Sequence, residues 1–370
     1  MNIAKKISGI LSKPIVLHYV MPALIIYLVI GTIAQKYIGL YEATKIFFAS
    51  PILWLGFTPL PGLPILISLL FINLAFKIMF KSPWNIKNSG IIITHIGAML
   101  LLLGGLFTAL FSNEGYIDLA QEQKKIFVTD YHNRVFAILN ERGEEIQIFE
   151  HEKLKSGDII TIDNTPIKLK IITSCRNCKI EKRSGDKGDY FGMAKHMILS
   201  NDKLKKLNEE NMAGLVFEVS GGDRDDGIYQ VLENVPKLPK VTTGGNVYQL
   251  ILRREQRKLP FSIELIEFKR DMHPGTSTAK AYSSRVRIYD GSSQWESLIS
   301  MNAPLRYKGY TFFQSSFIAT QNGDISVLAV VWNAGRTFPY ISGILMSIGI
   351  IIHLFARRKT KKKKGLENVS

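Results

Sequence analysis

The sequence predicts an integral membrane protein in which four transmembrane α-helices carry a large extracytoplasmic all-β, sandwich-like domain between helices three and four. Two observations support this fold class: four long windows are free of charge, and one long polar region consists of short strand-like runs. The 370 residues carry a net charge of +16 but are 46% hydrophobic, which excludes a disordered chain and argues against a nucleic-acid-binding protein.

The four windows without a charged residue are 14–35, 46–76, 88–113 and 337–356. A helix needs about 20 mostly apolar residues to cross a bilayer, and soluble core helices seldom contain such long apolar runs. The predicted transmembrane helices cover about 16–35, 62–80, 89–111 and 337–356. They divide the chain into an N-terminal membrane region (residues 1–111), an outer domain (residues 112–335), and a last helix with a basic tail (residues 336–370).

The first helix is expected to stay in the protein as an anchor. Its apolar stretch is longer than the hydrophobic region of a secretory signal peptide, and small residues at a cleavage site are not evident.

Basic residues near the helix ends predict the orientation. The N-terminus, the loop between helices two and three, and the tail hold 13 Lys and Arg but only one acidic residue. The opposite short loop has Lys36 and Lys45. Both termini are therefore expected to be cytoplasmic and the outer domain extracytoplasmic. The 13 basic residues are Lys5, Lys6, Lys13, Lys77, Lys81, Lys87, Arg357, Arg358, Lys359 and the four lysines 361–364.

The outer domain contains about a dozen short runs with strand chemistry, separated by Gly, Pro, Asn and Asp. The run 261–268 alternates apolar and polar residues, as a half-buried strand does. Such runs at regular spacing predict a sandwich or a barrel. The polar stretch 181–212 is predicted to be a loop or a short surface helix. Further predicted strands are 135–140, 158–163, 167–174, 215–220, 247–255, 310–317 and 325–332.

The only two cysteines, Cys175 and Cys178, form a C-x-x-C pair. Lys179 stands where a covalent haem site needs histidine, and a zinc site would need a second ligand pair. A structural or labile disulfide is the state that an oxidising compartment favours. A catalytic redox role is the alternative, although the surrounding sequence does not resemble a thioredoxin-like unit.

No nucleotide-binding or hydrolase motif is present, so an ATP-driven pump and a hydrolase have no support. The basic run Arg253, Arg254, Arg257 and Lys258 is typical of a solvated face, and an anionic partner or a haem propionate is the alternative interpretation.

Three histidines fall within predicted membrane helices: His18, His95 and His353. An ionisable side chain in hydrocarbon suggests function, and neutral imidazole suits haem iron, copper or zinc. All three lie within roughly 5–12 Å of the expected cytoplasmic surface at about 1.5 Å per residue. His18 and His353 are near enough to it to be simple boundary residues, whereas His95 is deeper.

Gly90, Gly97 and Gly104 recur every seven residues on helix three. Small residues at this spacing allow another helix to approach closely. At about 100° per residue, His95 points well away from this glycine stripe.

Four blocks of sequence resemble the ResB (CcsB) family of System II cytochrome c biogenesis proteins. Two are in the membrane region: G-T-I-A-Q at 31–35, and H-I-G-A-M-L-L-L-L-G-G at 95–105 followed by E-G-Y. Two are in the outer domain: R-K-L-P-F-S-I-E-L-I-E-F-K at 257–269, and N-A-P-L-R-Y-K-G-Y-T-F-F-Q-S-S-F at 302–317. The outer-domain blocks, in this order before a final helix, are the specific ones.

The resemblance implies a multi-pass protein of the bacterial inner (plasma) membrane that works with a ResC (CcsA)-like partner carrying a tryptophan-rich loop. Together such proteins move haem b across the membrane and attach it to the C-x-x-C-H motifs of apocytochrome c. His95 matches the family's transmembrane haem ligand. We expect the partner to supply the second axial ligand, with His18 or His353 as alternatives.

Thiol–disulfide oxidoreductases are a further expected partner class, and nucleic acid is not expected. The sequence offers no independent catalytic residues, so the chain is expected to be a subunit of a cytochrome c haem lyase. The alternative is a scaffold without haem that presents its β domain to another complex. One departure from many relatives is Asn333-Ala334-Gly335 before the last helix, where we expect the conformational freedom of Gly335 to preserve the turn.

Overall fold

The computed structural model describes residues 9, 11–185, 188–235, 237–276, 279–321 and 323–367, with side chains up to residue 357. The chain divides into a membrane unit, Met1–Asn113 with Trp332–Ser370, and a β unit, Glu114–Val331. The expected cytoplasmic residues Lys5 and Lys6, and the basic side chains after Arg357, lie outside what the structure describes.

Within the described ranges, the membrane unit has four helices long and apolar enough to cross a membrane. They are α2 (Ile15–Ile38), α4 (Leu63–Phe80), α5 (Ser89–Phe111) and α6 (Phe338–Glu367). The apolar portion of α6 ends at Arg357. This confirms the predicted four-helix architecture, which is that of a multi-pass membrane protein.

The segment between α2 and α4 has structure that the sequence pattern did not predict. It contains α3 (Leu40–Ala43), the π-helical turn η1 (Thr44–Ala49), and a hairpin of β1 (Ile52–Leu55) and β2 (Thr58–Pro61).

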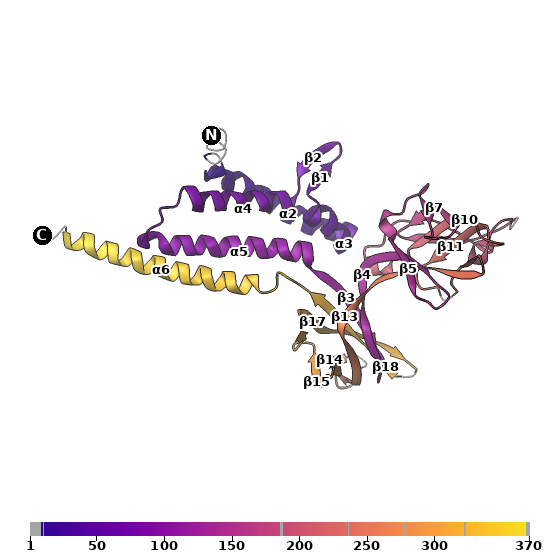
Figure 1. Cartoon of the computed structure of the whole chain (residues 1–370). Helices are drawn as coiled ribbons and strands as arrows, with labels where there is room; N and C mark the ends of the chain where they lie inside the picture. Colours follow the sequence, from indigo (N-terminus) through magenta and orange to yellow (C-terminus); the bar gives the residue numbers. More distant parts are fainter. Residues whose placement is uncertain are drawn as a thin grey trace. The chain divides into compact units, whose positions relative to one another are not determined.

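The glycine stripe of α5 packs on α6, as predicted, and the two helices lie side by side (Figure 1). A Cβ atom at Gly90 would lie 2.4 Å from the backbone nitrogen of His353, and one at Gly104 would lie 2.2 Å from Cβ of Phe338. The two helices are therefore antiparallel, and their backbones approach more closely than any larger residue permits.

Gly335 is needed for space, which corrects our expectation that it serves conformational freedom. A Cβ atom there would lie 2.2 Å from Oγ1 of Thr108 and 2.5 Å from the carbonyl oxygen of Gly104. Oδ1 of Asn333 accepts hydrogen bonds from the Gly335 amide (2.7 Å) and from the Thr108 hydroxyl (3.0 Å). The turn before α6 is thus tied to the end of α5.

The β unit contains a 10-stranded sheet and a four-stranded sheet built from antiparallel strand pairs, which confirms the predicted all-β domain between helices three and four. The larger sheet has the order β15-β14-β13-β4-β3-β18-β17-β16, with β5 paired to β4 and β12 to β13. Its strands are β3 (Asn113–Leu119), β4 (Lys124–Leu139), β5 (Glu145–Glu150), β12 (Lys240–Thr243), β13 (Asn246–Met272), β14 (Ala279–Asp290), β15 (Ser293–Ser300), β16 (Leu305–Tyr307), β17 (Tyr310–Thr320) and β18 (Gly323–Trp332).

The smaller sheet has the order β11-β10-β7-β6, and a separate two-stranded sheet pairs β8 with β9. The strands of the smaller sheet are β6 (Ile159–Thr161), β7 (Lys168–Cys175), β10 (Gly214–Ser220) and β11 (Gly227–Leu232). The separate pair is β8 (Cys178–Lys182) and β9 (Met197–Asn201). The stretch predicted as a loop or surface helix therefore contains β9, flanked by the 3₁₀ turns η4 (Gly192–Lys195) and η5 (Asn208–Glu210).

Two hydrophobic cores share the long strands β4 and β13, which run from one lobe of the β unit to the other (Figure 1). Phe136 and Leu250 belong to the first core, with the smaller sheet, whereas Val128 and Phe261 belong to the second. The two strands predicted at 247–255 and 261–268 are one continuous strand. It passes Pro260 because the pairing with β4 shifts register there, which removes the need for a ladder donor.

Candidate functional site

The α5 helix positions His95 with one imidazole nitrogen free. Nδ1 lies 2.7 Å from the carbonyl oxygen of Ile91, one turn earlier. Because a carbonyl oxygen only accepts, Nδ1 carries the proton, and in the neutral ring Nε2 then has the lone pair. Metal-binding histidines commonly have this arrangement, in which a backbone carbonyl orients the ring.

His18 repeats the arrangement in the first turn of α2. Its Nδ1 lies 2.9 Å from the carbonyl oxygen of Pro14, again one turn earlier, and its side chain is exposed. Nε2 of His18 is accordingly the ring nitrogen left for another partner.

His353 has different surroundings from the other two. It lies on the α6 face that packs against Gly90, and its buried Nδ1 has no hydrogen-bond partner among the described residues. His95 lies two residues from Gly97, and therefore about 200° around α5 from the glycine stripe that contacts α6. The structure thus places His353 and His95 on different sides of α5 and does not bring them together.

An apolar groove of about 240 Å³ lies between α4 and α5. Ile96 and Met99, which line it, are next to His95 in the chain and one turn further on. Leu102, seven residues after His95 and so on nearly the same face of α5, packs against a buried cluster formed by Val20 of α2 with Leu66 and Leu70 of α4. The His95 side of α5 is therefore turned toward α2 and α4. The groove is lined by Phe71, Ala75, Ile78, Met79, Ile96, Met99, Leu100 and Leu103.

In the β unit, Cys175 and Cys178 are joined as a disulfide across the turn between β7 and β8. Both side chains are buried, and Leu199 and Leu232 belong to the same small cluster. The sulfur atoms are covered by Gly214, where a Cβ atom would lie 2.5 Å from Sγ of Cys178. Burial on this scale fits a structural bond better than one open to exchange with a partner.

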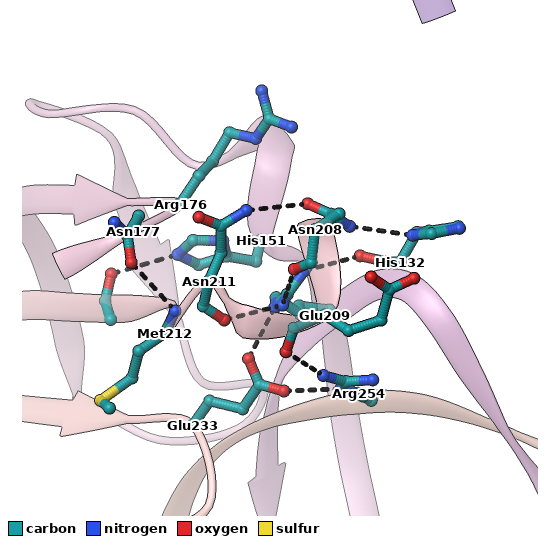
Figure 2. Close-up of polar contacts among 12 residues, drawn as sticks. His132, His151, Arg176, Asn177, Asn208, Glu209, Asn211, Met212, Glu233 and Arg254 are labelled. Atoms are coloured by element: carbon teal, nitrogen blue, oxygen red, sulfur yellow. Dashed lines mark hydrogen bonds and ion pairs between the residues drawn. The ribbon is translucent and has the colours of Figure 1, made fainter. Parts of the chain in front are cut away.

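A buried cluster of charges connects this turn to the long strands (Figure 2). Oε2 of Glu233 accepts from Nε of Arg134 at 2.6 Å, and Oε1 accepts from Nε of Arg254 at 2.8 Å. Nη2 of Arg134 also donates to the carbonyl oxygens of Asn208 (3.2 Å) and Asn211 (3.0 Å). Burial opposes the charge of Glu233, but the hydrogen bonds and charges of the two arginines outweigh it and hold its pKa below the usual value.

In the basic run on β13, the three arginines are partly buried in ion pairs, whereas Lys258 is exposed. Arg253 pairs with Glu145, Arg254 with Glu233, and Arg257 with Asp130. These guanidinium groups already have carboxylate partners, so the run gives little support to a site for haem propionates.

Two histidines of the β unit escaped the sequence analysis because no motif surrounds them. Burial lowers the pKa of both His132 and His151. Nδ1 of His132 lies 2.9 Å from the amide nitrogen Nδ2 of Asn208, and Nε2 of His151 lies 3.1 Å from the carbonyl oxygen of Gly214. Both rings therefore belong to the polar surroundings of the cluster in Figure 2. Across the regions of the chain that are described, no group of three or more His, Cys, Asp or Glu has the geometry to hold a metal ion.

Comparison with known proteins supports the resemblance. The model of the ResB-like family matches residues 239–329, which include both outer-domain blocks named above. Protein NrfI of Wolinella succinogenes is 24% identical over 269 residues, which cover 70% of this chain. The chain spans only 26% of the length of that relative. The family resemblance is confirmed by these matches.

Proposed function

We propose, with the ResB-like match as the premise, that this chain acts in cytochrome c biogenesis as a membrane subunit that handles haem b. In this proposal both termini are cytoplasmic, the β unit is extracytoplasmic, and the membrane is a bacterial inner membrane. The ResB-like segment in residues 239–329 is the observation that carries the role.

His95 is the proposed haem ligand of this chain. The hydrogen bond from Nδ1 to Ile91 orients the ring and leaves Nε2 available, which fits axial ligation of haem iron. The adjacent groove has the apolar surface that a macrocycle requires, and Ile96 and Met99 are its nearest residues in the chain. Ligation would hold the haem in one orientation, so the contribution of His95 is positioning rather than acid–base chemistry.

A ResC (CcsA)-like membrane protein is the proposed partner, because haem binding by one imidazole leaves the second axial position to be filled. His353 lies on the other side of α5, in the α6 contact, so it is a poor source for that ligand. His18, with Nε2 free, is the better alternative within this chain. Apocytochrome c is the proposed client, docking on the β unit, and thiol–disulfide oxidoreductases are proposed to keep its cysteines reduced.

The test is the haem spectrum of the chain co-purified with its partner. We expect His95→Ala to lose most of the Soret absorption and added imidazole to restore some of it. His196→Ala, in the β unit, is the matched control and should leave the band unchanged. An unchanged band in His95→Ala would refute the ligand assignment. Absence of haem absorption from the wild-type complex would favour the scaffold function instead.

A double variant tests which residue supplies the second haem ligand. We expect His18→Ala with His353→Ala in one chain to retain the haem content of the wild type, because the partner supplies the ligand. A loss of haem in His18→Ala alone would transfer that role to His18.

A further inference from the structure

The hairpin β1–β2 exposes several large apolar side chains. The ring of Phe57 at its tip is 102% exposed, and Leu55 and Trp54 are 69% and 63% exposed. Ile52 and Trp54 of β1 are paired with Pro61 and Pro59 of β2. We propose that this hairpin lies in the interface between lipid headgroups and acyl chains, with Trp54, Leu55 and Phe57 inserted into the lipid.

An aqueous location does not fit the pattern of side chains. A hairpin in water alternates between an apolar face and a polar one. Here both faces are apolar, because the half-buried pair Leu53 and Leu60 faces one way and Trp54 with Pro59 faces the other. The charge-free window 46–76 contains the whole hairpin, so no ionised side chain holds it in water.

A location deep in the hydrocarbon does not fit the backbone. A sheet of only two strands leaves N–H and C=O groups unpaired along both edges, and each such group costs several kcal/mol in hydrocarbon. Pro51, Pro59 and Pro61 remove three of the N–H donors, and hydroxyl or amide groups of the same chain donate to the carbonyl oxygens of Pro51, Ile52 and Pro61, but the other edge carbonyl oxygens remain. The headgroup region offers water to these carbonyls and apolar chains to the aromatic rings, which is why tryptophan concentrates there.

The base of the hairpin is fixed to the middle of α2 and to the start of α4. The hydroxyl of Tyr27 on α2 donates to the carbonyl oxygen of Pro61 at 2.6 Å. The amide of Gly62, directly before α4, donates to the carbonyl oxygen of Pro51 at 2.7 Å. Phe48 packs on Gly31 of α2, where a Cβ atom would lie 2.5 Å from its ring. The hairpin therefore lies directly before α4 and is held against α2 at its base, which leaves its tip to face the surroundings.

The neighbouring residues also mark an interfacial level. Nζ of Lys36 lies 5.8 Å from the centre of the Tyr37 ring, and Nζ of Lys45 lies 5.9 Å from the centre of the Tyr41 ring. Tyrosine and lysine together at the end of a spanning helix are typical of the membrane boundary. Lys36 and Tyr37 end α2, and Tyr41 and Lys45 lie in the connection between α2 and α4 that also contains the hairpin.

The experiment uses the full-length protein in phosphatidylcholine vesicles with Trp84, Trp295 and Trp332 changed to Phe. Trp54 is then the only tryptophan, and spin-labelled phosphatidylcholine quenches its fluorescence according to depth. We expect a label near the headgroups to reduce Trp54 emission about twofold, and a label near the chain ends to have a smaller effect, because interfacial insertion reaches about 5–10 Å. A chain with Trp295 as its only tryptophan is the matched control and should not respond to either lipid.

Aqueous iodide supplies the opposing measurement. Weak quenching of Trp54 by iodide, together with strong quenching by the shallow label, supports the proposal. Strong quenching by iodide without quenching by lipid overturns it in favour of a water-exposed hairpin. Protection of Trp54 from both quenchers overturns it in favour of a protein partner or a second copy of the chain. The circular dichroism of each variant shows whether it is folded.

Discussion

The buried charges of the β unit and the histidines of the membrane unit differ in how fully their polar atoms are hydrogen-bonded. Both carboxylate oxygens of Glu233 have guanidinium partners, and Arg134 is bonded on every side. His95 and His18 use one nitrogen locally and leave the other open. A satisfied network stabilises a fold, whereas an open donor or acceptor in an apolar setting is available to a ligand.

Glu233→Gln should lower the free energy of unfolding the most, because it leaves two guanidinium groups facing a neutral amide. Removal of one partner from a buried ion pair costs about 3–5 kcal/mol of unfolding free energy. Urea unfolding of the full-length protein in detergent, followed by circular dichroism, measures this change. Glu218→Gln, exposed on β10, is the control and should stay within about 0.5 kcal/mol of wild type. Equal stability of the two variants would show that the cluster does not stabilise the β unit.

Gly97→Ala tests the helix contact in the membrane unit. The new Cβ atom would lie 2.7 Å from Cγ of Met346 and 3.1 Å from its backbone nitrogen, so α5 and α6 must separate. Overpacking of this kind costs about 1–3 kcal/mol. Gly105→Ala is a matched control on the same helix, because nothing lies within 4 Å of its Cβ position. Thermal unfolding in detergent should separate the two variants, and a similar midpoint for both would contradict the close contact.

Changing Cys175 and Cys178 to serine together should cost about 2 kcal/mol, since the disulfide closes a loop of only four residues. Buried sulfurs should also resist a reductant followed by a maleimide until the protein is unfolded. Mass spectrometry of the labelled protein measures this protection. Rapid labelling of the folded chain would instead favour a redox role for the pair.

The smallest expected effect is on pH dependence. The pKa of Glu233 is lower in the folded protein than in the unfolded chain, so its stabilising contribution is complete above the unfolded value of about 4.5. This contribution declines as pH falls from there through the folded pKa, with a slope of at most about 1.4 kcal/mol per pH unit for one proton. As pH is lowered, the free energy of unfolding should fall less steeply in Glu233→Gln than in wild type. Parallel curves would assign the acid sensitivity to other carboxylates.

The membrane helices and the glycine contact were predictable because each rests on a local pattern. Charge-free windows define the spans, and the spacing of Gly90, Gly97 and Gly104 defines a contact face. The partner of that face was not predictable, because α6 begins more than two hundred residues further along the chain. The hairpin within 46–76 was missed because its prolines ended the helical pattern without indicating what replaced it.

Some residues of the candidate site were likewise predictable from local sequence, and others were not. His95 was predictable as a single ionisable residue in an apolar window, and its bond to Ile91 follows from helix geometry. The position of His353 across α5 required the pairing of two distant helices. The Glu233 cluster was not predictable, because its members come from strands that no local pattern connects.

The pairing of α5 with α6 has a consequence for how the protein is made. The 226 residues from 112 to 337 separate the two helices, and a ribosome adds about 5–20 residues per second. For roughly 10–45 s, α5 would therefore sit in the bilayer with its glycine face uncovered. During that interval the same face is open to a second nascent copy. The yield of correctly assembled protein should depend on how quickly translation delivers the last helix.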